Sequence, residues 1–444
     1  MFRIFKRTIY FLFSAVLLFP FLANGQEAKS DSLLQNATLD HVIQYALQHQ
    51  PLVQQSLIDQ EIVNKTIRGK LADWYPQINF AYNYQRNIDL QTSIIGGNPI
   101  RFGVNNTSYG QFNGTQVIFN RDVLLANSTA SKVRIQSEQV TARNKIDAVV
   151  NTTKAFYDVL ATSQQIKVSE EVITRLQRSL KDAQSQYNSG LTDKTDYKRA
   201  MISLSNAKAS LKSNQELLTY KVEYLKTLMG YPVKGDLTIV YDTLQMEQEI
   251  NLDTLQTADY TNRIEFRLLT TQKLLQEANV KYSYWGFIPT LSAYGSYIYN
   301  YQNNNFGELY DKRYKNTFVG ATFTLPLFQG MKRTAKIQEQ KLTLERLDKD
   351  VDNLKSNLNT DYTRAMAGYK ANLATYLALK DNVDLAREVY DVIQLQYKNG
   401  VKTYLDVTIA EADLRTARIN YFNALYQVLS SKLDAQKSLG QITY

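Results

Sequence analysis

The stretches YNSGLTDKTDY (residues 187–197) and YKNGVKTYLDV (residues 397–407) decide the fold, because one chain contains the same turn twice. Each stretch has a Tyr, two polar residues and a Gly, followed six residues later by an Asp. Gly190 and Gly400 are 210 residues apart, and the tyrosines and aspartates keep the same spacing. A period of this length is far beyond that of a solenoid repeat and predicts a duplicated domain.

The residues before each turn predict a very long helix. From residue 121 to Asn188 there is no Pro or Gly, and the apolar residues follow the heptad rhythm of a coiled coil. At about 1.5 Å per residue, such a helix is roughly 100 Å long. The pattern recurs from Lys332 to Asn399, interrupted only by Gly368. The heptad positions of the first helix are Ile146, Val149, Thr153, Phe156 and Leu160, and, after a discontinuity, Ile166, Ile173, Leu180 and Tyr187, with Leu176 and Ala183 between them.

Gly190 and Gly400 mark the ends of these helices, since glycine readily adopts the left-handed conformation of a C-cap. A returning helix is expected after each turn, at residues 192–229 and 402–439. Each half of the chain therefore contains a long helical hairpin, and the two quoted stretches are the hairpin tips.

Strand patterns precede each long helix. In PQINFAYNYQRN (residues 76–87), Ile78, Phe80, Tyr82 and Tyr84 alternate with polar residues, which is the period of a strand with one apolar face. The stretches PTLSAYGSYIYNYQ (289–302) and TFVGATFTLPLF (317–328) alternate in the same way. The stretch SYGQFNGTQVIF (108–119) alternates less cleanly and predicts a bulge. The apolar faces of the second pair consist of Leu291, Ala293, Tyr297, Tyr299 and Tyr301, and of Val319, Ala321, Phe323, Leu325 and Leu327.

The remaining segments complete two similar halves. Polar loops are expected within the strand pairs, at 87–107 and 302–315, and helical segments at 38–74 and 259–284 precede the pairs. The predicted organisation is a signal peptide (1–25), a first repeat (26–230, with strand pair 76–120 and hairpin 121–229), a linking segment (231–258) and a second repeat (259–444, with strand pair 289–328 and hairpin 332–439).

Four amphipathic strands of about 11 residues match a bilayer crossing, but only a closed barrel satisfies their backbones in lipid. A barrel needs about eight strands, so the strands of several copies must be pooled. Two copies would give eight strands and an interior plugged by side chains, whereas three would give twelve strands and an aqueous bore. The polar strand faces favour the trimer. The predicted fold is mainly α with a transmembrane β part.

The N-terminus indicates export. Arg3, Lys6 and Arg7 precede an apolar run that ends in LANGQ, which is typical of a signal peptide cut after Gly25. Three of the 51 Lys and Arg residues lie in this leader, which leaves 48 against 42 Asp and Glu, without a basic block. Nucleic acid is therefore not an expected partner. The chain has no Cys that could form a disulfide or carry a lipid.

No pattern for catalysis or cofactor binding is found. His41 and His49 are the two histidines and lie eight residues apart, which does not fit the i, i+4 pair of a helical metal site. There is no phosphate-binding glycine loop, nucleophile elbow or His-based triad. The adjacent Glu170 and Glu171 fit a solvated helix face. We therefore expect neither an enzyme nor a cofactor.

The order of these elements resembles the TolC-like outer membrane efflux proteins over nearly all of the mature chain. The resemblance rests on LADWYPQINF and YWGFIPTLSA before the strands, PLFQGMKR before the second long helix, the two tips, and LSSKLDAQKSLG near the C-terminus. It implies a homotrimer in the outer membrane, whose twelve-stranded β-barrel continues into an α-helical barrel across the periplasm. It also implies a periplasmic adaptor protein and an inner-membrane transporter as partners, outer-membrane lipid around the barrel, and a passive exit duct for efflux or type I secretion.

The resemblance also implies a gate at the tips. Asp406 would line the periplasmic constriction as a ring of three carboxylates, which favours cations, and Asp196 would contact the gate. Tyr397 would hydrogen-bond to Asp196, and Lys402 would pair with Asp196 or Thr195 on the same or a neighbouring hairpin. Three positions depart from the family pattern: Ile264 replaces a frequent Pro, Lys402 a frequent Arg, and Ile409 a second acidic residue.

Each of these residues also has a simpler interpretation. Asp406 and Asp196 would be favoured near a helix N-terminus in any case, and Lys402 could be a solvated residue at a helix start. Leu191, Val401, Tyr404 and Leu405 give the tips apolar character, either as adaptor contacts or as staples of their own turns. For the whole chain, the alternatives to a duct are a periplasmic coiled-coil scaffold and a general porin.

Overall fold

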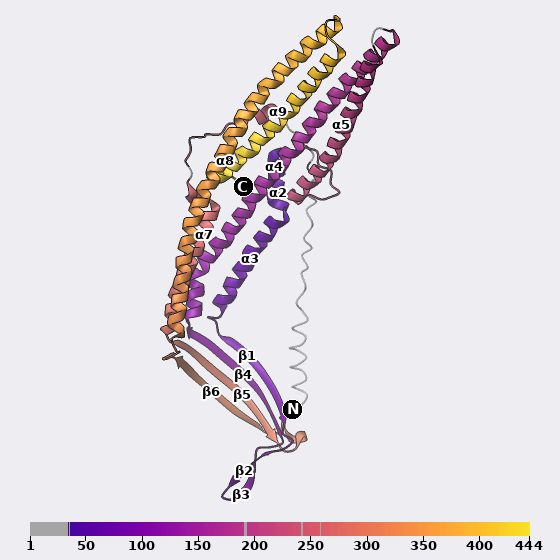
Figure 1. Cartoon of the computed structure of the whole chain (residues 1–444). Helices are drawn as coiled ribbons and strands as arrows, with labels where there is room; N and C mark the ends of the chain where they lie inside the picture. Colours follow the sequence, from indigo (N-terminus) through magenta and orange to yellow (C-terminus); the bar gives the residue numbers. More distant parts are fainter. Residues whose placement is uncertain (1–33, 35, 191–192, 241–242, 258) are drawn as a thin grey trace.

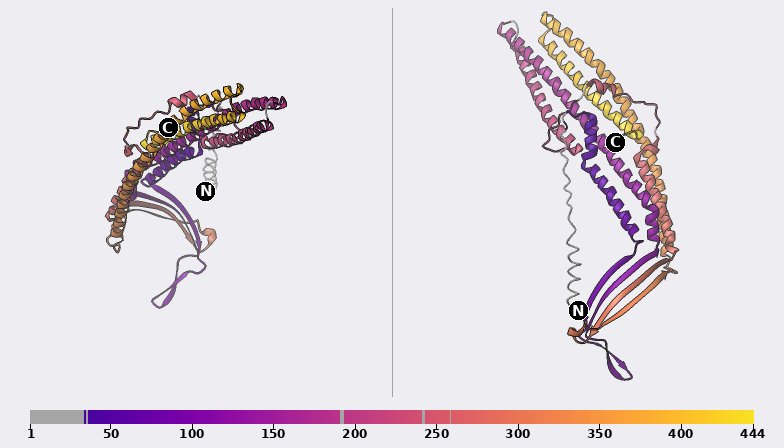
Figure 2. Two further views of the ribbon diagram at one scale, coloured as in Figure 1. Left: turned by 45° about the horizontal axis from the view of Figure 1, so that its top comes forward. Right: turned by 180° about the vertical axis from the view of Figure 1, so that it is seen from behind.

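The computed structural model describes residues 34, 36–190, 193–240, 243–257 and 259–444, so the expected signal peptide and Leu191 lie outside the described residues. A four-stranded sheet forms one end of the molecule and two long helical hairpins form the other (Figure 1). Helices continue directly from the strands, and together they form one curved wall (Figure 2).

The strands are β1 (Gln77–Arg86), β2 (Gln91–Ile95), β3 (Asn98–Phe102), β4 (Asn106–Phe119), β5 (Thr290–Asn303) and β6 (Arg313–Thr324). The α-helices are α2 (Leu39–His49), α3 (Pro51–Ala72), α4 (Arg121–Asn188), α5 (Lys194–Met229), α6 (Thr243–Gln248), α7 (Ile264–Tyr284), α8 (Lys332–Lys398) and α9 (Tyr404–Leu439). Short 3₁₀ turns cover Tyr260–Asn262, Trp285–Phe287 and Phe306–Glu308.

The main sheet has the order β1-β4-β5-β6, and every neighbouring pair is antiparallel. The predicted bulge is confirmed, since the β4–β5 register shifts between Val117 and Phe119. The prediction of a polar loop at 87–107 was only partly right, because these residues include the β2–β3 hairpin. Gly96 and Gly97 turn this hairpin with φ of 61° and 87°, which glycine adopts without steric cost.

The register places the apolar alternation of the strands on one face of the sheet. Phe80 lies opposite Phe112, which in turn lies opposite Tyr297 of β5. Cross-strand partners share a face, so the predicted apolar sets of β1, β5 and β6 coincide, and we call this the apolar face. The opposite, polar face carries a network in which the Gln111 amide donates to Ser296 Oγ (3.0 Å) and Ser296 donates to Asn113 Oδ1 (2.8 Å). The sheet is therefore amphipathic across its full width.

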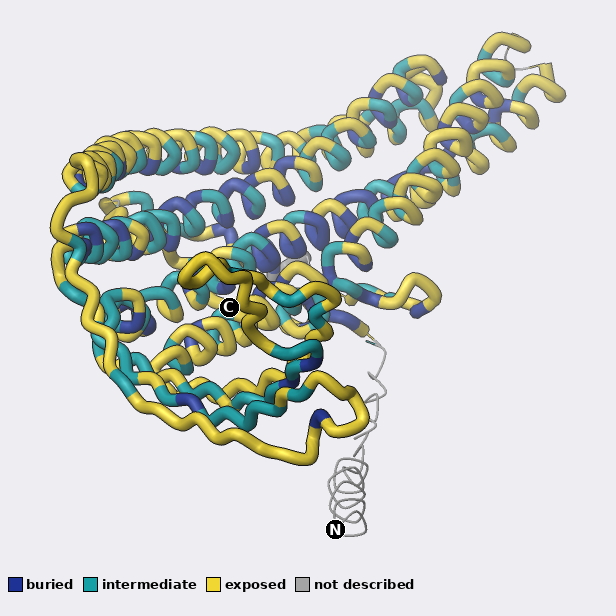
Figure 3. Tube along the Cα trace, turned by 90° about the horizontal axis from the view of Figure 1, so that it is seen from below, coloured by how far each residue is buried: buried dark blue, intermediate teal, exposed yellow. Residues whose placement is uncertain are grey.

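The helices contain the core. The main hydrophobic cluster lies where α4, α5, α8 and α9 meet the linking segment, and Phe156 and Leu425 are fully buried there. The prediction that Thr153, Phe156 and Leu160 face inward is confirmed. Beyond Leu160 the buried side of the helix differs from the predicted one, since Val168 and Val172 are buried whereas the predicted position Ile166 is half-buried. Figure 3 shows buried residues between the helices and exposed ones along much of the sheet.

Two helix boundaries differ from the prediction. Segment 38–74 is two helices, because Pro51 has no N–H to continue α2 and instead begins α3. The helix expected from 259 begins at Ile264, after the 3₁₀ turn that Asp259 caps through the N–H of Thr261 (2.9 Å). Both changes place a helix start beside the C-terminus of another helix.

These helix starts form two equivalent junctions. α5 ends at Gly230 (φ 70°), and a Cβ on this glycine would lie 2.4 Å from the carbonyl oxygen of His49, just before α3 begins. α9 ends at Gly440 (φ 72°), where a Cβ would lie 2.9 Å from the carbonyl oxygen of Asn262, just before α7. In each case a short helix therefore begins where a hairpin helix ends. The result is two interrupted helical columns, one made of α5 and α3 and the other of α9 and α7.

The linking segment holds α8 and α9 near their middle. Tyr369 of α8 donates to the carbonyl of Ile250 (2.9 Å) and accepts from the N–H of Leu252 (3.1 Å). Glu247 of α6 forms an ion pair with Lys380 of α8 (2.7 Å) and accepts a hydrogen bond from Tyr421 of α9. The predicted linking segment is thus a strap across both helices.

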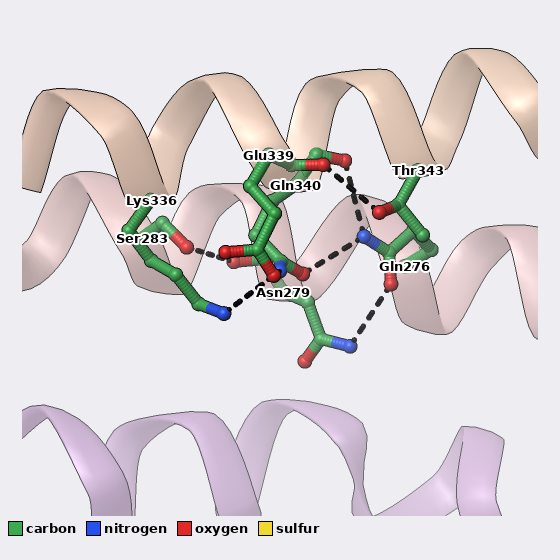
Figure 4. A network of polar contacts seen from close by, with 7 residues as sticks. All are labelled: Gln276, Asn279, Ser283, Lys336, Glu339, Gln340 and Thr343. Atoms are coloured by element: carbon green, nitrogen blue, oxygen red, sulfur yellow. Dashed lines mark hydrogen bonds and ion pairs between the residues drawn. The ribbon is translucent and has the colours of Figure 1, made fainter.

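Nearer the sheet, α7 and α8 pack through polar side chains (Figure 4). Gln276 of α7 is buried and donates to both the carbonyl (3.1 Å) and the Oε1 (2.9 Å) of Gln340. Asn279 donates to Gln276 (3.3 Å), which extends the network along α7. Such a satisfied network fixes the register of two helices that offer few apolar contacts here.

The two junctions give a stability prediction. Gly230→Ala should destabilise the protein by more than Gly400→Ala, because both glycines have positive φ but only Gly230 is packed against backbone. We expect about 1–2 kcal/mol for the left-handed conformation at either site, and a further loss at Gly230 from the displaced His49 carbonyl. Thermal unfolding followed by helical circular dichroism measures the difference. Equal midpoints for the two variants would contradict it.

Candidate functional site: the helical tips

The first tip is closed by local caps. α4 ends before Gly190 (φ 71°), and α5 begins after Asp193, whose side chain accepts the N–H of Thr195. Hydrogen bonds from Thr195 hold the pKa of the Asp193 carboxyl below its ordinary value. Thr195 itself is exposed.

The second tip has a complete capping box. Gly400 (φ 71°) follows α8, so both predicted tip glycines have the expected left-handed conformation. Asp406 Oδ2 accepts the N–H (2.9 Å) and the hydroxyl (2.8 Å) of Thr403, while Thr403 Oγ1 accepts the N–H of Asp406 (3.3 Å). The Thr403 backbone bond, with the hydroxyl bond and the charge of Lys402, lowers the pKa of Asp406. Within one copy, Thr403 is therefore the N-cap of α9, and the carboxylate of Asp406 completes the capping box.

The two tip aspartates differ in their surroundings despite the repeat. Asp196 is on the first turn of α5, like Asp406 on α9, but it faces Arg199 at 3.8 Å. At the first tip the N-cap is Asp193, which occupies the position equivalent to Thr403. Asp196 is consequently a half-buried carboxylate with one loose ion pair, whereas Asp406 is fixed by its own turn.

The predicted lock between the hairpins has different partners within one copy. The Tyr397 hydroxyl donates to Gln186 Oε1 (3.0 Å) on α4, not to Asp196. Lys402 is exposed and has no ion-pair partner among the described residues, so it pairs with neither Asp196 nor Thr195 in one copy. The sequence analysis missed Gln186 because it lies one residue before the repeated stretch that begins at Tyr187.

Tyr404, for which an adaptor contact and a staple of its own turn were both open, is buried within one copy. Its side chain is only 4% exposed and packs against Ala183 of α4 and Ala200 of α5. Its ring also meets that of Tyr397 edge-on, with 6.1 Å between centroids. The small alanines leave room for the ring, so Tyr404 joins the two hairpins and does not form an exposed adaptor contact. Val401 and Leu405 do remain exposed, at 70% and 43%.

A buried ion pair lies below the tips, between α4 and α9. Arg175 Nε is 3.0 Å from Glu411 Oε1, and the guanidinium lies 5.8 Å from the centroid of the Tyr390 ring. Burial raises the pKa of Glu411 despite this partner. Arg418 of α9 pairs with Glu171 of α4 on the more exposed side. Both ion pairs join the first half of the chain to the second, as Lys154–Asp434 and Lys437–Asp147 do further along α4 and α9. Glu171 therefore has a structural partner that the sequence did not predict.

The described part of the chain offers no candidate metal centre. It contains no group of three or more His, Cys, Asp or Glu side chains arranged to hold a metal ion. None of its helices combines the length and apolarity needed to cross a bilayer.

Comparisons with known proteins agree with this architecture. The family described as outer membrane efflux protein matches residues 42–231 and 274–441. The outer membrane protein TolC of Escherichia coli is 22% identical over 436 residues, which cover 96% of this chain and 86% of TolC. The outer membrane efflux protein BepC of Brucella suis is 21% identical over a match that covers 100% of this chain and 92% of BepC. The Campylobacter jejuni CmeC outer membrane channel superposes with a TM-score of 0.73 at 15% identity, over 94% and 90% of the chains.

The capping box predicts a local effect. Thr403→Ala should speed amide hydrogen exchange in the first turn of α9, because losing an N-cap costs about 1 kcal/mol. Thr416→Ala, at an exposed position within α9, serves as the control and should leave that turn unchanged. Since the pKa of Asp406 is lowered, the cap should persist above the ordinary aspartate pKa of about 3.9 and be lost as the pH falls through the folded-state value. Equal amide exchange in the first turn of α9 in the Thr403→Ala and Thr416→Ala variants would contradict the role of the capping box.

The burial of Tyr404 predicts that it holds the hairpins together. Tyr404→Ala should widen the distance between spin labels placed at Gln184 and Lys398, because it removes a ring that fills the space between α4 and α5. Labelling is specific, since the chain has no Cys. Leu405→Ala, at the adjacent exposed position, should leave the distances unaltered. A Tyr404→Ala distribution that matches that of the native chain would refute this role.

Proposed function

The chain belongs to the outer membrane efflux protein family, and from this premise we propose that it is the passive outer-membrane exit duct of a tripartite efflux or type I secretion system. Substrates would pass from an inner-membrane transporter, across the periplasm, through the bore of the protein. The energy for transport would come from that transporter.

The observation that carries the proposal is the amphipathic sheet with two free edges. β1 and β6 each pair on one side only, and their outer N–H and C=O groups have no partner strand in one copy. β1 and β6 run in opposite directions, so β6 of one copy can pair with β1 of the next as a further antiparallel neighbour. Repeating this step closes a barrel without edges, which is the form that lipid permits. The apolar face would meet lipid and the polar face a wet bore.

The helices support closure by lateral contacts. α5 and α3 lie at one flank of the wall and α8 at the other, since α8 packs on α9 and α7 and the α5–α3 column packs on α4. Both flanks carry exposed apolar side chains that their own hairpins do not cover. A neighbouring copy would bury them together. They are Leu385, Val389, Val392 and Leu395 on α8, and Ile202, Leu217, Tyr220 and Tyr224 on α5.

Three copies are the expected number. Twelve strands leave an aqueous bore, whereas eight leave an interior that side chains fill. The Asn, Gln and Ser residues of the polar face fit the wet interior. The division of the chain into repeats 26–230 and 259–444 belongs to this proposal and is supported by the equivalent junctions at Gly230 and Gly440.

The tips would be the gate and the contact with the adaptor. Three copies would place three Asp406 and three Asp196 carboxylates around the narrow end, with Thr195, Tyr397 and Lys402 beside them. An exposed pair made by Lys402 with a neighbouring copy would contribute only about 0–1 kcal/mol, so a partner that binds the open tips could shift it. Exposed Val401 and Leu405 would contact the adaptor. Gly190 and Gly400 shape the two turns.

A periplasmic scaffold is the second candidate, and the long hairpins alone would fit it. It does not account for the sheet, where Ile78, Phe80 and Phe323 are 74%, 60% and 64% exposed in one copy. A soluble spacer would have no reason to present this apolar face. A general porin would not need hairpins of about 100 Å.

Conductance in a planar bilayer tests the duct. The purified protein should form a small, cation-selective channel, and Asp406→Asn should reduce its preference for cations because the charge of the ring is removed. Lys402→Ala should raise the conductance if the lock spans neighbouring copies. Asp122→Asn, near the sheet, is the matched charge control. Well-folded protein that never inserts would contradict the duct and favour the scaffold, whereas an unchanged Asp406→Asn channel would exclude only the carboxylate ring.

A further inference from the structure

The apolar face changes in character along the strands. Near the helices its rows contain aliphatic residues and Phe, such as Ile78 opposite Gly114 and Leu291 opposite Phe323. At the end far from the helices, which we call the distal end, its rows contain tyrosines. Tyr310 folds back onto them from the β5–β6 connection, with its hydroxyl 2.6 Å from that of Tyr82. Such a belt of tyrosines is typical of a membrane–water interface. Its members are Tyr82, Tyr84, Tyr299, Tyr301 and Tyr310.

Two cations lie on the same face, within this belt. Lys315 of β6 is the partner of Tyr299, and Arg313 is the partner of Tyr301. The Arg313 guanidinium lies 4.6 Å from the centroid of the Tyr299 ring. Because cross-strand partners share a face, both cations point to the side that would meet lipid. Arg86 ends β1 on this face too, at the opposite edge of the sheet.

These cations have no acidic partner in the described chain. Neither Arg313, Lys315 nor Arg86 forms an ion pair there, although Glu308 and Asp311 lie in the adjacent connection. A cation on the lipid-facing side of a barrel is unfavourable in the hydrocarbon and close to neutral at the interface. Its position in the tyrosine belt, without a carboxylate, therefore fits an anion supplied by the membrane surface.

We propose that Arg313, Lys315 and the Tyr299 and Tyr301 rings form a site for the phosphate group of a lipid in the outer leaflet. This inference rests on the membrane-embedded barrel proposed above. Arg313 supplies a guanidinium that can donate two parallel hydrogen bonds to a phosphate, and Lys315 adds a point charge. The tyrosines pack against the glycerol or sugar portion beside it.

The neighbouring copy would complete the site. Closure of the barrel brings the β1 edge of one copy against the β6 edge of the next, so Arg86 approaches the distal end of β6. Three such sites would then lie around the barrel, one at each joint between copies. A phosphorylated lipid at the joint would touch two chains and would therefore stabilise the trimer against dissociation.

The test compares two double variants that lose the same charges at the distal end. Arg313→Gln/Lys315→Gln removes the proposed site. Arg101→Gln/Lys312→Gln is the control, because Arg101 lies on the β2–β3 hairpin and the Lys312 ammonium lies 5.5 Å from the centroid of the Tyr314 ring, on the polar face. Native mass spectrometry of the detergent-solubilised protein counts bound lipid. The probes are a bis-phosphorylated lipid A, its dephosphorylated form, and inorganic phosphate as competitor.

The native protein and the control should bind the phosphorylated lipid with a maximum of three per trimer, and the site variant should bind it about 25-fold more weakly, since each lost cation contributes about fivefold. The dephosphorylated lipid should bind no more tightly to the native protein than to the site variant. Equal binding by all three proteins would overturn the site. If inorganic phosphate displaced the lipid from the native protein as effectively as the phosphorylated lipid itself, the site would be a phosphate-ion site and the proposal of a lipid ligand would be overturned.

Two further outcomes separate this inference from the proposed function. If the site variant loses its trimer in detergent without any lipid, the cations pair with carboxylates of the neighbouring copy, and the lipid site is wrong. If the protein inserts and conducts but binds lipid as the site variant does, the duct stands and this inference alone fails. Failure to insert into a bilayer would overturn both.

Discussion

The structure depends on backbone groups that one chain cannot satisfy. The outer edges of β1 and β6 present N–H and C=O groups at the depth where hydrocarbon would surround them, and each unpaired group there costs several kcal/mol. Only another copy of the same sheet offers the matching partners in the right direction. The free edges thus require an assembly before the protein can perform any task, and the exposed apolar flanks of α5 and α8 extend the same requirement along the helices.

The two halves of the wall have a similar order of elements. In each half, one long helix continues from a strand, and a column made of two shorter helices lies beside it. Gly230 and Gly440 let a hairpin helix end directly against the start of the next helix, where a side chain would collide with backbone. The two halves differ at their tips. Asp193 caps the first tip and leaves Asp196 with Arg199, whereas Asp406 is held in the capping box of the second.

Local patterns predicted what local forces control. The bounds of α4, the tip glycines, the strand faces and the bulge followed from heptad spacing, glycine and alternation. The β2–β3 hairpin was missed, although Gly96-Gly97 between two short runs is a hairpin signal. The partners of Tyr397 and Tyr404 could not be predicted, because Gln186, Ala183 and Ala200 lie some 200 residues away and are reached only through the packing of two hairpins.

The strap formed by residues 247–252 makes the second hairpin a lever. α8 is fixed at Tyr369 and Lys380, and α9 at Tyr421, so the arm beyond the strap runs from about residue 380 to the tip at 400 and is roughly 30 Å long. Tyr404 and the Arg175–Glu411 ion pair hold this arm to the first hairpin. A rotation of about 10° at this fulcrum would move the tip by about 5 Å, the rise of one helical turn, while the sheet stays still. Motion of the tip would therefore load the contacts between the hairpins before it loads the sheet, so a partner that binds the tips would have to displace those contacts first.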